Sequence, residues 1–148
     1  VKTEFIGEGQ IRLSNSGNAL PKSIEWDLVD TPDIAQTIAV TCFGLGIECH
    51  LKGLQTLKIK ETDRLLALAS ELSKMGAKVQ TSDNDLILMA RKILHKNVVI
   101  RTYHDHRMAM AFAPMVALVP LDIADPEVVS KSYPEFWNDL RQVGVRMN

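Results

Sequence analysis

The sequence has few cysteines, no excess of either charge and no long apolar run. Its formal net charge is −1 over 148 residues, so there is no basic surplus to attract nucleic acid. The longest apolar run, residues 108–120, is too short to cross a bilayer, and no signal or transit segment is visible. We therefore expect a cytoplasmic protein with neither a membrane nor a nucleic acid as its partner.

The two cysteines, Cys42 and Cys49, stand in apolar surroundings and show no metal-ligand spacing. They can be read as reduced core thiols or as a disulfide, and the apolar context favours reduced thiols. Hydrophobic residues make up 46% of the chain, which is enough for one ordinary globular core. The sequence thus predicts a single domain over residues 1–148.

Residues 60–64, Lys-Glu-Thr-Asp-Arg, form a charged cluster directly before a predicted helix. At helical spacing Glu61 projects close to the apolar stripe and Arg64 lies on its flank, so both belong to the mouth of the helix. Thr62 or a neighbour can act as N-cap, and the free N–H groups of the first turn favour an anion there. Gly76 supplies the stop. The stripe itself consists of Leu65, Leu68, Ala69, Leu72 and Met75.

Residues 103–110 form a second charged cluster, which leads into an apolar helix predicted over residues 106–118. Asp105 is the expected N-cap, with His106 and Arg107 in the first turn. Because a charge at the start of a buried helix needs a partner, we expect Arg107 to be paired. Two charged helix starts together predict one anion site.

The rest of the chain alternates between strand and helix signals. From residue 23 the predicted order is strand, helix, strand, helix, strand, strand, and a second pass starts at residue 98. Pro32 fits the first turn of a helix that Gly44 and Gly46 end. Pro114 lacks a backbone donor, so the helix over 106–118 should kink or end early there. The first helix is predicted to bury Ile34, Ile38, Ala39 and Cys42.

The predicted class is therefore α/β. We expect the last helix near residues 133–143 and a strand followed by a turn within residues 47–57. Other strands are predicted at residues 2–6, 10–14, 23–27, 78–81, 86–89, 98–101 and 121–123.

At the two charged clusters the chain resembles a known family, the 5-enolpyruvylshikimate-3-phosphate synthases or 3-phosphoshikimate 1-carboxyvinyltransferases. Four motifs carry the resemblance in the family's order, from about residue 30 to residue 140. They are Asp-Thr-Pro-Asp at 30–33, Lys-Glu-Thr-Asp-Arg at 60–64, Asp-His-Arg-Met-Ala-Met at 105–110 and Lys-Ser-Tyr-Pro at 131–134.

The resemblance implies a fold of repeated βαβαββ units, with helices packed against small sheets. The opening hairpin, residues 2–14, could supply the two strands that the last unit lacks. Members of the family are considerably longer and have two similar domains. The resemblance therefore implies that residues 1–148 are the C-terminal part of a two-domain enolpyruvyl transferase whose N-terminal domain is absent.

By this resemblance, Asp33 matches the carboxylate that contacts the ring hydroxyls of shikimate 3-phosphate and is proposed as base for the attacking 5-hydroxyl. Glu61 matches the acidic residue implicated in proton transfer at the phosphoenolpyruvate methylene. From the residues alone, Asp33 is also readable as a helix cap near Pro32. Glu61 is also readable as a carboxylate favoured by the helix dipole.

Arg64 and Arg107 match two arginines that bind the carboxylate and phosphate of phosphoenolpyruvate, for which planar bidentate donors are well suited. Lys60 matches a substrate-side lysine and Lys131 a lysine near phosphoenolpyruvate, although each is also readable as a solvated lysine. His106 matches a histidine beside the phosphate that can donate a hydrogen bond or carry a proton. A capped structural histidine is the alternative.

A metal site is not expected. His104 and His106 stand at i and i+2, which face apart, and no third ligand is near them in the sequence. The resemblance likewise implies neither a metal nor a cofactor. Its implied partners are shikimate 3-phosphate, phosphoenolpyruvate and the missing N-terminal domain.

The implied reaction is transfer of the enolpyruvyl group from phosphoenolpyruvate to the 5-hydroxyl of shikimate 3-phosphate, with release of phosphate. This is a step of aromatic amino acid biosynthesis, and the chain alone is expected to be inactive. Two alternatives stay open. One is a non-enzymatic anion-binding domain of the same fold, and the other is an enolpyruvyl transferase that acts on a UDP-sugar.

Overall fold

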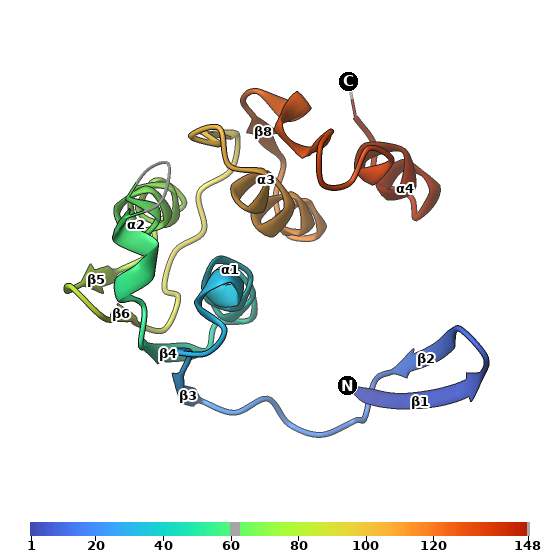
Figure 1. The fold of residues 1–148 in the computed structure, drawn as a ribbon, viewed down its shortest axis with the longest axis horizontal. Coiled ribbons are helices and arrows are strands. Elements are labelled where there is room, and N and C mark those ends of the chain that lie inside the picture. Colours follow the sequence, from blue (N-terminus) through green and yellow to red (C-terminus); the bar gives the residue numbers. More distant parts are fainter. Residues whose placement is uncertain (60–62, 148) are drawn as a thin grey trace.

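A four-stranded sheet forms one side of the molecule. The computed structural model describes residues 1–59 and 63–147. The strand order is β3-β4-β6-β5, with β3 and β4 parallel and the other pairs antiparallel. Helices α1 and α2 lie side by side on one face of this sheet (Figure 1). The elements, in chain order, are β3 (Ser23–Asp27), α1 (Ala35–Leu45), β4 (Glu48–Lys52), α2 (Arg64–Lys74), β5 (Val79–Thr81) and β6 (Leu86–Leu88). This order is the expected βαβαββ unit.

Helix α1 begins after a short 3₁₀ helix, η1 (Pro32–Ile34), and ends at Gly46, which adopts a left-handed φ of 74°. Gly44 lies inside the helix, so only Gly46 serves as the predicted stop. The expectation that Ile34 is a core residue is wrong, since 48% of it is exposed. The tighter winding of the 3₁₀ turn rotates its side chain off the stripe that α1 buries.

Helix α2 follows its predicted pattern closely. Asp63 is the N-cap, and its carboxylate accepts the N–H of Leu66 at 3.0 Å. Another 3₁₀ helix, η2 (Gln55–Ile59), precedes it. Ala69 is half-buried, whereas the other members of the stripe are fully buried: Leu65, Leu68, Leu72 and Met75. The stripe packs against the sheet and anchors α2 to the core.

The second half of the chain contributes the short parallel pair β7 (Val98–Ile100) and β8 (Leu121–Ile123) and the helix α3 (His106–Phe112). The predicted early end at Pro114 is confirmed. The α-helical winding stops at Phe112 and continues as the 3₁₀ helix η3 (Ala113–Ala117). The chain finishes with η4 (Pro126–Val129) and α4 (Phe136–Gln142).

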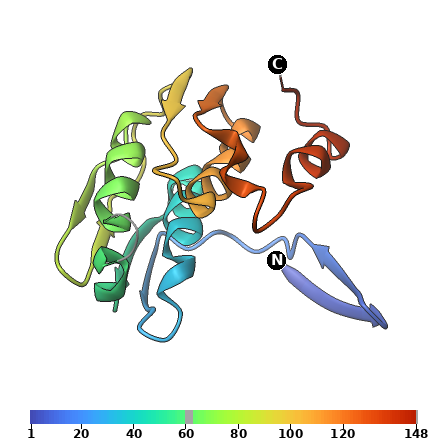
Figure 2. The same ribbon diagram turned by 45° about the horizontal axis from the view of Figure 1, so that its top comes forward.

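The opening hairpin stands apart from the rest of the molecule (Figures 1 and 2). Its strands are β1 (Lys2–Gly7) and β2 (Gln10–Ser14). The expectation that they complete the last unit is wrong, because in the described part of the chain they pair only with each other and β7 pairs only with β8. The tight turn pairs the two strands locally, and residues 15–22 form an extended connection from the hairpin to β3.

Cys42 and Cys49 are both buried and unbonded, in agreement with the reading as core thiols. A hydrogen bond with Cys42, together with burial, raises the pKa of the Cys49 thiol. Within residues 1–59 and 63–147, no helix has the length and apolar character to cross a membrane.

Two glycines with the same left-handed φ of 74°, Gly46 and Gly53, allow a matched test of the fold. A Cβ at Gly53 would lie 2.5 Å from the backbone nitrogen of Val29, whereas at Gly46 it would meet nothing within 4 Å. Both alanine variants lose about 1 kcal/mol through the unfavourable φ. We expect Gly53→Ala to lose about 2 kcal/mol more, because the overlap forces the backbone apart. The measurement is the free energy of unfolding in urea, and equal losses would contradict the described close approach.

Candidate active site

Three helix starts meet at one place in the structure. Strands β3 and β4 are parallel, so the helices that follow them begin at the same edge of the sheet. This brings Asp33, in η1, beside Arg64, the first residue of α2. The third start is that of α3, whose N-cap is Asp105. Helix α3 packs against α1.

The charged side chains at these starts alternate in sign. Arg64 Nε lies 2.7 Å from Asp105 Oδ2, and Arg64 Nη1 lies 3.1 Å from Asp33 Oδ1. The other carboxylate oxygen of Asp33 is 3.3 Å from Arg107 Nη2. We call these four residues, Asp33, Arg64, Asp105 and Arg107, the charged network. The predicted pairing of Arg107 is therefore confirmed.

The charged network has a buried half and an open half. The Arg64 and Asp105 side chains are 7% and 6% exposed, whereas those of Asp33 and Arg107 are 45% and 30% exposed. Removing two charges from water is costly, and their close contact offsets that cost only when both partners are present. The buried pair therefore holds the helix starts together, and the open pair is accessible to a ligand.

Gln36, on α1, extends the charged network and was not anticipated from the sequence. It is fully buried, and its Nε2 donates to Asp105 Oδ2 at 3.1 Å. Asp105 also accepts the backbone N–H of Arg107 at 2.9 Å, which confirms it as the N-cap. The sequence feature that could have identified Gln36 is its place on the helix face that otherwise buries Ala35 and Ala39.

The other predicted site residues divide into three groups. His106 is half-buried beside the charged network, with Nδ1 4.0 Å from Asp105 Oδ1. Lys131 lies on an exposed turn after η4, and among the described residues no hydrogen bond or ion pair joins it to the charged network. Lys60 and Glu61 lie outside the described residues. The structure therefore brings together Asp33, Arg64, Arg107 and His106.

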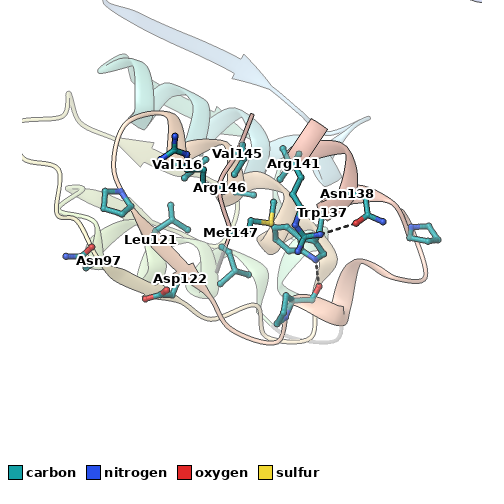
Figure 3. A pocket seen from close by; sticks show the side chains of 16 residues that line it. Asn97, Val116, Leu121, Asp122, Trp137, Asn138, Arg141, Val145, Arg146 and Met147 are labelled. Atoms are coloured by element: carbon teal, nitrogen blue, oxygen red, sulfur yellow. Dashed lines mark hydrogen bonds between the residues drawn. The ribbon is translucent and has the colours of Figure 1, made fainter. Parts of the chain in front are cut away.

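A groove of about 800 Å³ lies elsewhere, between β8, η3, α4 and the end of the chain (Figure 3). Some of its polar side chains have local partners: Arg141 donates to Asn138 at 3.0 Å and Trp137 Nε1 donates to the carbonyl of Pro126 at 2.8 Å. No member of the charged network lines it. Within the described ranges, no group of three or more His, Cys, Asp or Glu residues could hold a metal ion.

The chemistry available at the charged network is anion binding combined with proton acceptance. Planar guanidinium groups bind carboxylates and phosphates through paired N–H donors. A half-exposed carboxylate beside them can contact hydroxyl groups or accept a proton. The fold and the charged network together define an α/β domain whose partly open charged groups have the chemistry to bind a small anion.

Comparison with known proteins identifies the family. Residues 6–140 match the model of the family described as EPSP synthase (3-phosphoshikimate 1-carboxyvinyltransferase), and the chain belongs to that family. It is 45% identical over 147 residues to the 3-phosphoshikimate 1-carboxyvinyltransferase of Bacteroides fragilis (strain YCH46), covering 97% of this chain and 35% of that protein. The resemblance seen in the four motifs is thereby confirmed.

Further relatives agree. The 3-phosphoshikimate 1-carboxyvinyltransferase of Paraburkholderia phymatum is 40% identical, over 89% of this chain and 31% of its own length. The structure of EPSP synthase from Acinetobacter baumannii superposes with a TM-score of 0.67 at 24% identity, covering 76% of this chain and 27% of that one. That likeness concerns the fold. The chain thus spans about a third of the length of the curated relatives that it matches.

The charged network can be tested through two N-cap aspartates. Asp63→Ala removes a cap that accepts one backbone N–H, so we expect it to cost about 1 kcal/mol. Asp105→Ala removes a cap and also leaves the Arg64 guanidinium without its buried partner, so we expect a loss of about 3–5 kcal/mol. Urea unfolding of both variants measures the difference. Losses of the same size would show that the buried ion pair contributes nothing.

Proposed function

We propose that this chain forms part of the active site of a 3-phosphoshikimate 1-carboxyvinyltransferase. The reaction transfers the enolpyruvyl group of phosphoenolpyruvate to the 5-hydroxyl of shikimate 3-phosphate and releases phosphate. The observation that carries the proposal is the contact of one carboxylate, Asp33, with both Arg64 and Arg107. It concentrates two anion-binding groups and one proton acceptor at a single, partly open place.

The two arginines differ in the way that they would serve the ligand. Arg64 is buried and oriented by Asp105, so its guanidinium plane is set before the ligand arrives. Arg107 is more exposed, and a guanidinium has several N–H donors, of which Asp33 engages one nitrogen. An incoming carboxylate or phosphate would bind Arg107 on its open side, where bidentate pairing is strongest, and the nearby charge of the Arg64 guanidinium would stabilise it.

Asp33 is the proposed contact to shikimate 3-phosphate and the base for its 5-hydroxyl. Its carboxylate accepts from Arg64 and Arg107, which orients both oxygens, and it is 45% exposed. A carboxylate has about four lone-pair positions, so it can hold both arginines and still accept a hydroxyl proton. Positioning of this kind is the basis of general base catalysis.

The remaining roles rest on matching positions. Glu61 is proposed to transfer a proton at the phosphoenolpyruvate methylene, and Lys60 to contact the substrate. His106 is proposed to donate a hydrogen bond to the phosphate or to carry a proton. Lys131 is proposed to bind phosphoenolpyruvate from the turn before α4.

In the proposed reaction, the 5-hydroxyl oxygen attacks C2 of phosphoenolpyruvate as the methylene gains a proton and becomes a methyl group. The resulting tetrahedral adduct then loses a methyl proton and expels phosphate, which restores the double bond in the product. Each proton transfer by a positioned group is worth roughly 10²- to 10⁴-fold in rate. Arginine and lysine stabilise the anionic groups throughout, and the scheme needs no cofactor.

We further propose that residues 1–148 form one domain, the C-terminal part of a two-domain enzyme in the cytoplasm. The chain covers 35% of the Bacteroides fragilis relative, which supports this division. The second domain would supply the groups that bind the phosphate of shikimate 3-phosphate. Closure of two domains around both substrates would also exclude water from the adduct.

The arginine roles can be tested in the complete two-domain enzyme. We expect Arg107→Ala to lose a charge-assisted hydrogen bond of about 1.5–3 kcal/mol, which lowers kcat/KM for phosphoenolpyruvate by about 10- to 150-fold. Arg64→Ala should lower kcat/KM at least as much, because it also leaves Asp105 without its buried partner. Arg12→Ala, on the exposed hairpin, is the control and should leave kcat/KM unchanged. Unchanged constants in both site variants would favour a purely structural network, as in a non-enzymatic binding domain.

The 148-residue chain alone should show no transferase turnover. The residues proposed here bind phosphoenolpyruvate and move protons, whereas the phosphate of shikimate 3-phosphate would lack several contacts of ~1.5–3 kcal/mol each. Phosphate release from both substrates is the measurement, with a Glu61→Gln and Lys131→Ala double variant as background. Release above that background would refute the prediction, and activity on adding the separate N-terminal domain would support it.

A further inference from the structure

Glu71 is a buried carboxylate that the proposed reaction does not use. It lies on α2 two turns after Arg64, with none of its side chain exposed. Both carboxylate oxygens accept from Lys74, at 2.7 and 2.6 Å. In addition, Oε2 accepts the backbone N–H of Arg101 at 3.1 Å and Oε1 accepts the hydroxyl of Tyr103 at 2.7 Å. Glu71 therefore joins α2 to a segment thirty residues further along the chain.

The segment that Glu71 contacts has an unfavourable backbone. Tyr103 and His104 have φ values of 54° and 58°, so two consecutive residues with side chains occupy the left-handed region. L-residues are disfavoured there because Cβ crowds the backbone, and such conformations persist only where the surroundings hold them. Glu71 accepts hydrogen bonds from Arg101 and Tyr103, so it contacts this turn directly.

The turn leads directly into the charged network. The N–H of Asp105 donates to the carbonyl of Thr102 at 2.9 Å, and Asp105 then caps the helix that carries Arg107. Helix α2 holds this segment at two points, since Arg64 binds Asp105 and Glu71 binds Tyr103. Glu71 stands at i+7 from Arg64, which is about two helical turns, so both project from the same side of α2.

A purely local role does not account for these contacts. Lys74 is half-exposed and stands at i+3, and a Glu–Lys pair at that spacing forms equally well on a solvated helix face. Glu71 is instead directed inward, among Leu68 and Leu72, where an unpaired carboxylate would be costly. Burial and the hydrogen bond to Glu71 both raise the pKa of Tyr103, in keeping with a phenol that stays protonated and donates.

We propose that Glu71 is a positioning residue for the anion site. By holding residues 101–104 in their left-handed turn, it sets where Asp105 and Arg107 lie, and thereby the geometry with which Arg107 meets its ligand. The part of this inference that concerns phosphoenolpyruvate rests on the function proposed above. The mechanical part, that Glu71 holds the turn, stands on the contacts alone.

Two variants of the complete enzyme test the proposal. Tyr103→Phe keeps the ring and removes one hydroxyl. Glu71→Gln keeps the size but replaces one of the two carboxylate oxygens, which accept separately from Arg101 and Tyr103, with an NH2 donor. Leu86→Val, in strand β6 and fully buried, is the control for a general loss of stability. Hydrogen exchange of residues 101–110 reports the turn, and KM and kcat for phosphoenolpyruvate report the site.

We expect Tyr103→Phe and Glu71→Gln to speed exchange of residues 101–110 and to raise KM for phosphoenolpyruvate roughly fivefold, the effect of one lost hydrogen bond, with a smaller change in kcat. Leu86→Val should lower the melting temperature without either change. If both site variants resemble Leu86→Val, the proposal is overturned.

The remaining outcomes separate the two proposals. In one of them, Tyr103→Phe and Glu71→Gln speed exchange of residues 101–110 but leave KM for phosphoenolpyruvate unchanged, whereas Arg107→Ala raises it. Glu71 is then not a positioning residue for this ligand, and the inference fails. If exchange rises and none of the variants, including Arg107→Ala, changes KM, the proposed function fails while the hold of Glu71 on the turn is supported.

Discussion

The arrangement of this molecule depends on one buried ion pair, between Arg64 and Asp105. Their 2.7 Å contact joins the start of α2 to the start of α3, and neither side chain is appreciably exposed. Either charge alone would be strongly destabilising in that place, because the protein interior solvates an ion poorly. The two helices must therefore meet at this point, and Asp33, Gln36 and Arg107 take their positions around it.

The fold explains why these charged groups gather at one place. Parallel strands β3 and β4 bring the starts of their following helices to one edge of the sheet, and α3 packs alongside α1. Helix starts offer free N–H groups and charged caps, so their convergence concentrates polar groups against an apolar core. The apolar stripe of α2 fixes that helix, while Arg64 and Glu71 on its flank reach the segment that carries Asp105.

Local signals were sufficient to predict much of the fold. The strand at residues 23–27, the cap at Asp105, the stripe of α2 and the early end before Pro114 all follow from interactions within a few residues. The wrong predictions concern positions whose burial or strand pairing depends on distant parts of the chain. Ile34 was predicted to be buried but lies in a 3₁₀ turn, and the hairpin was predicted to join the last sheet but pairs only within itself in the described residues.

The sequence was also enough to predict the family, because charged motifs directly before apolar helices survive as a readable pattern in a single chain, and the same motifs supplied the candidate site residues. The contacts between those residues required the folded structure. Asp33 binds Arg64 across 31 positions and Arg107 across 74, and Gln36 binds Asp105 across 69. No periodicity specifies such pairings. They follow from the packing of α1, α2 and α3, which excludes water, so that each buried charge must bind the groups that the fold brings beside it.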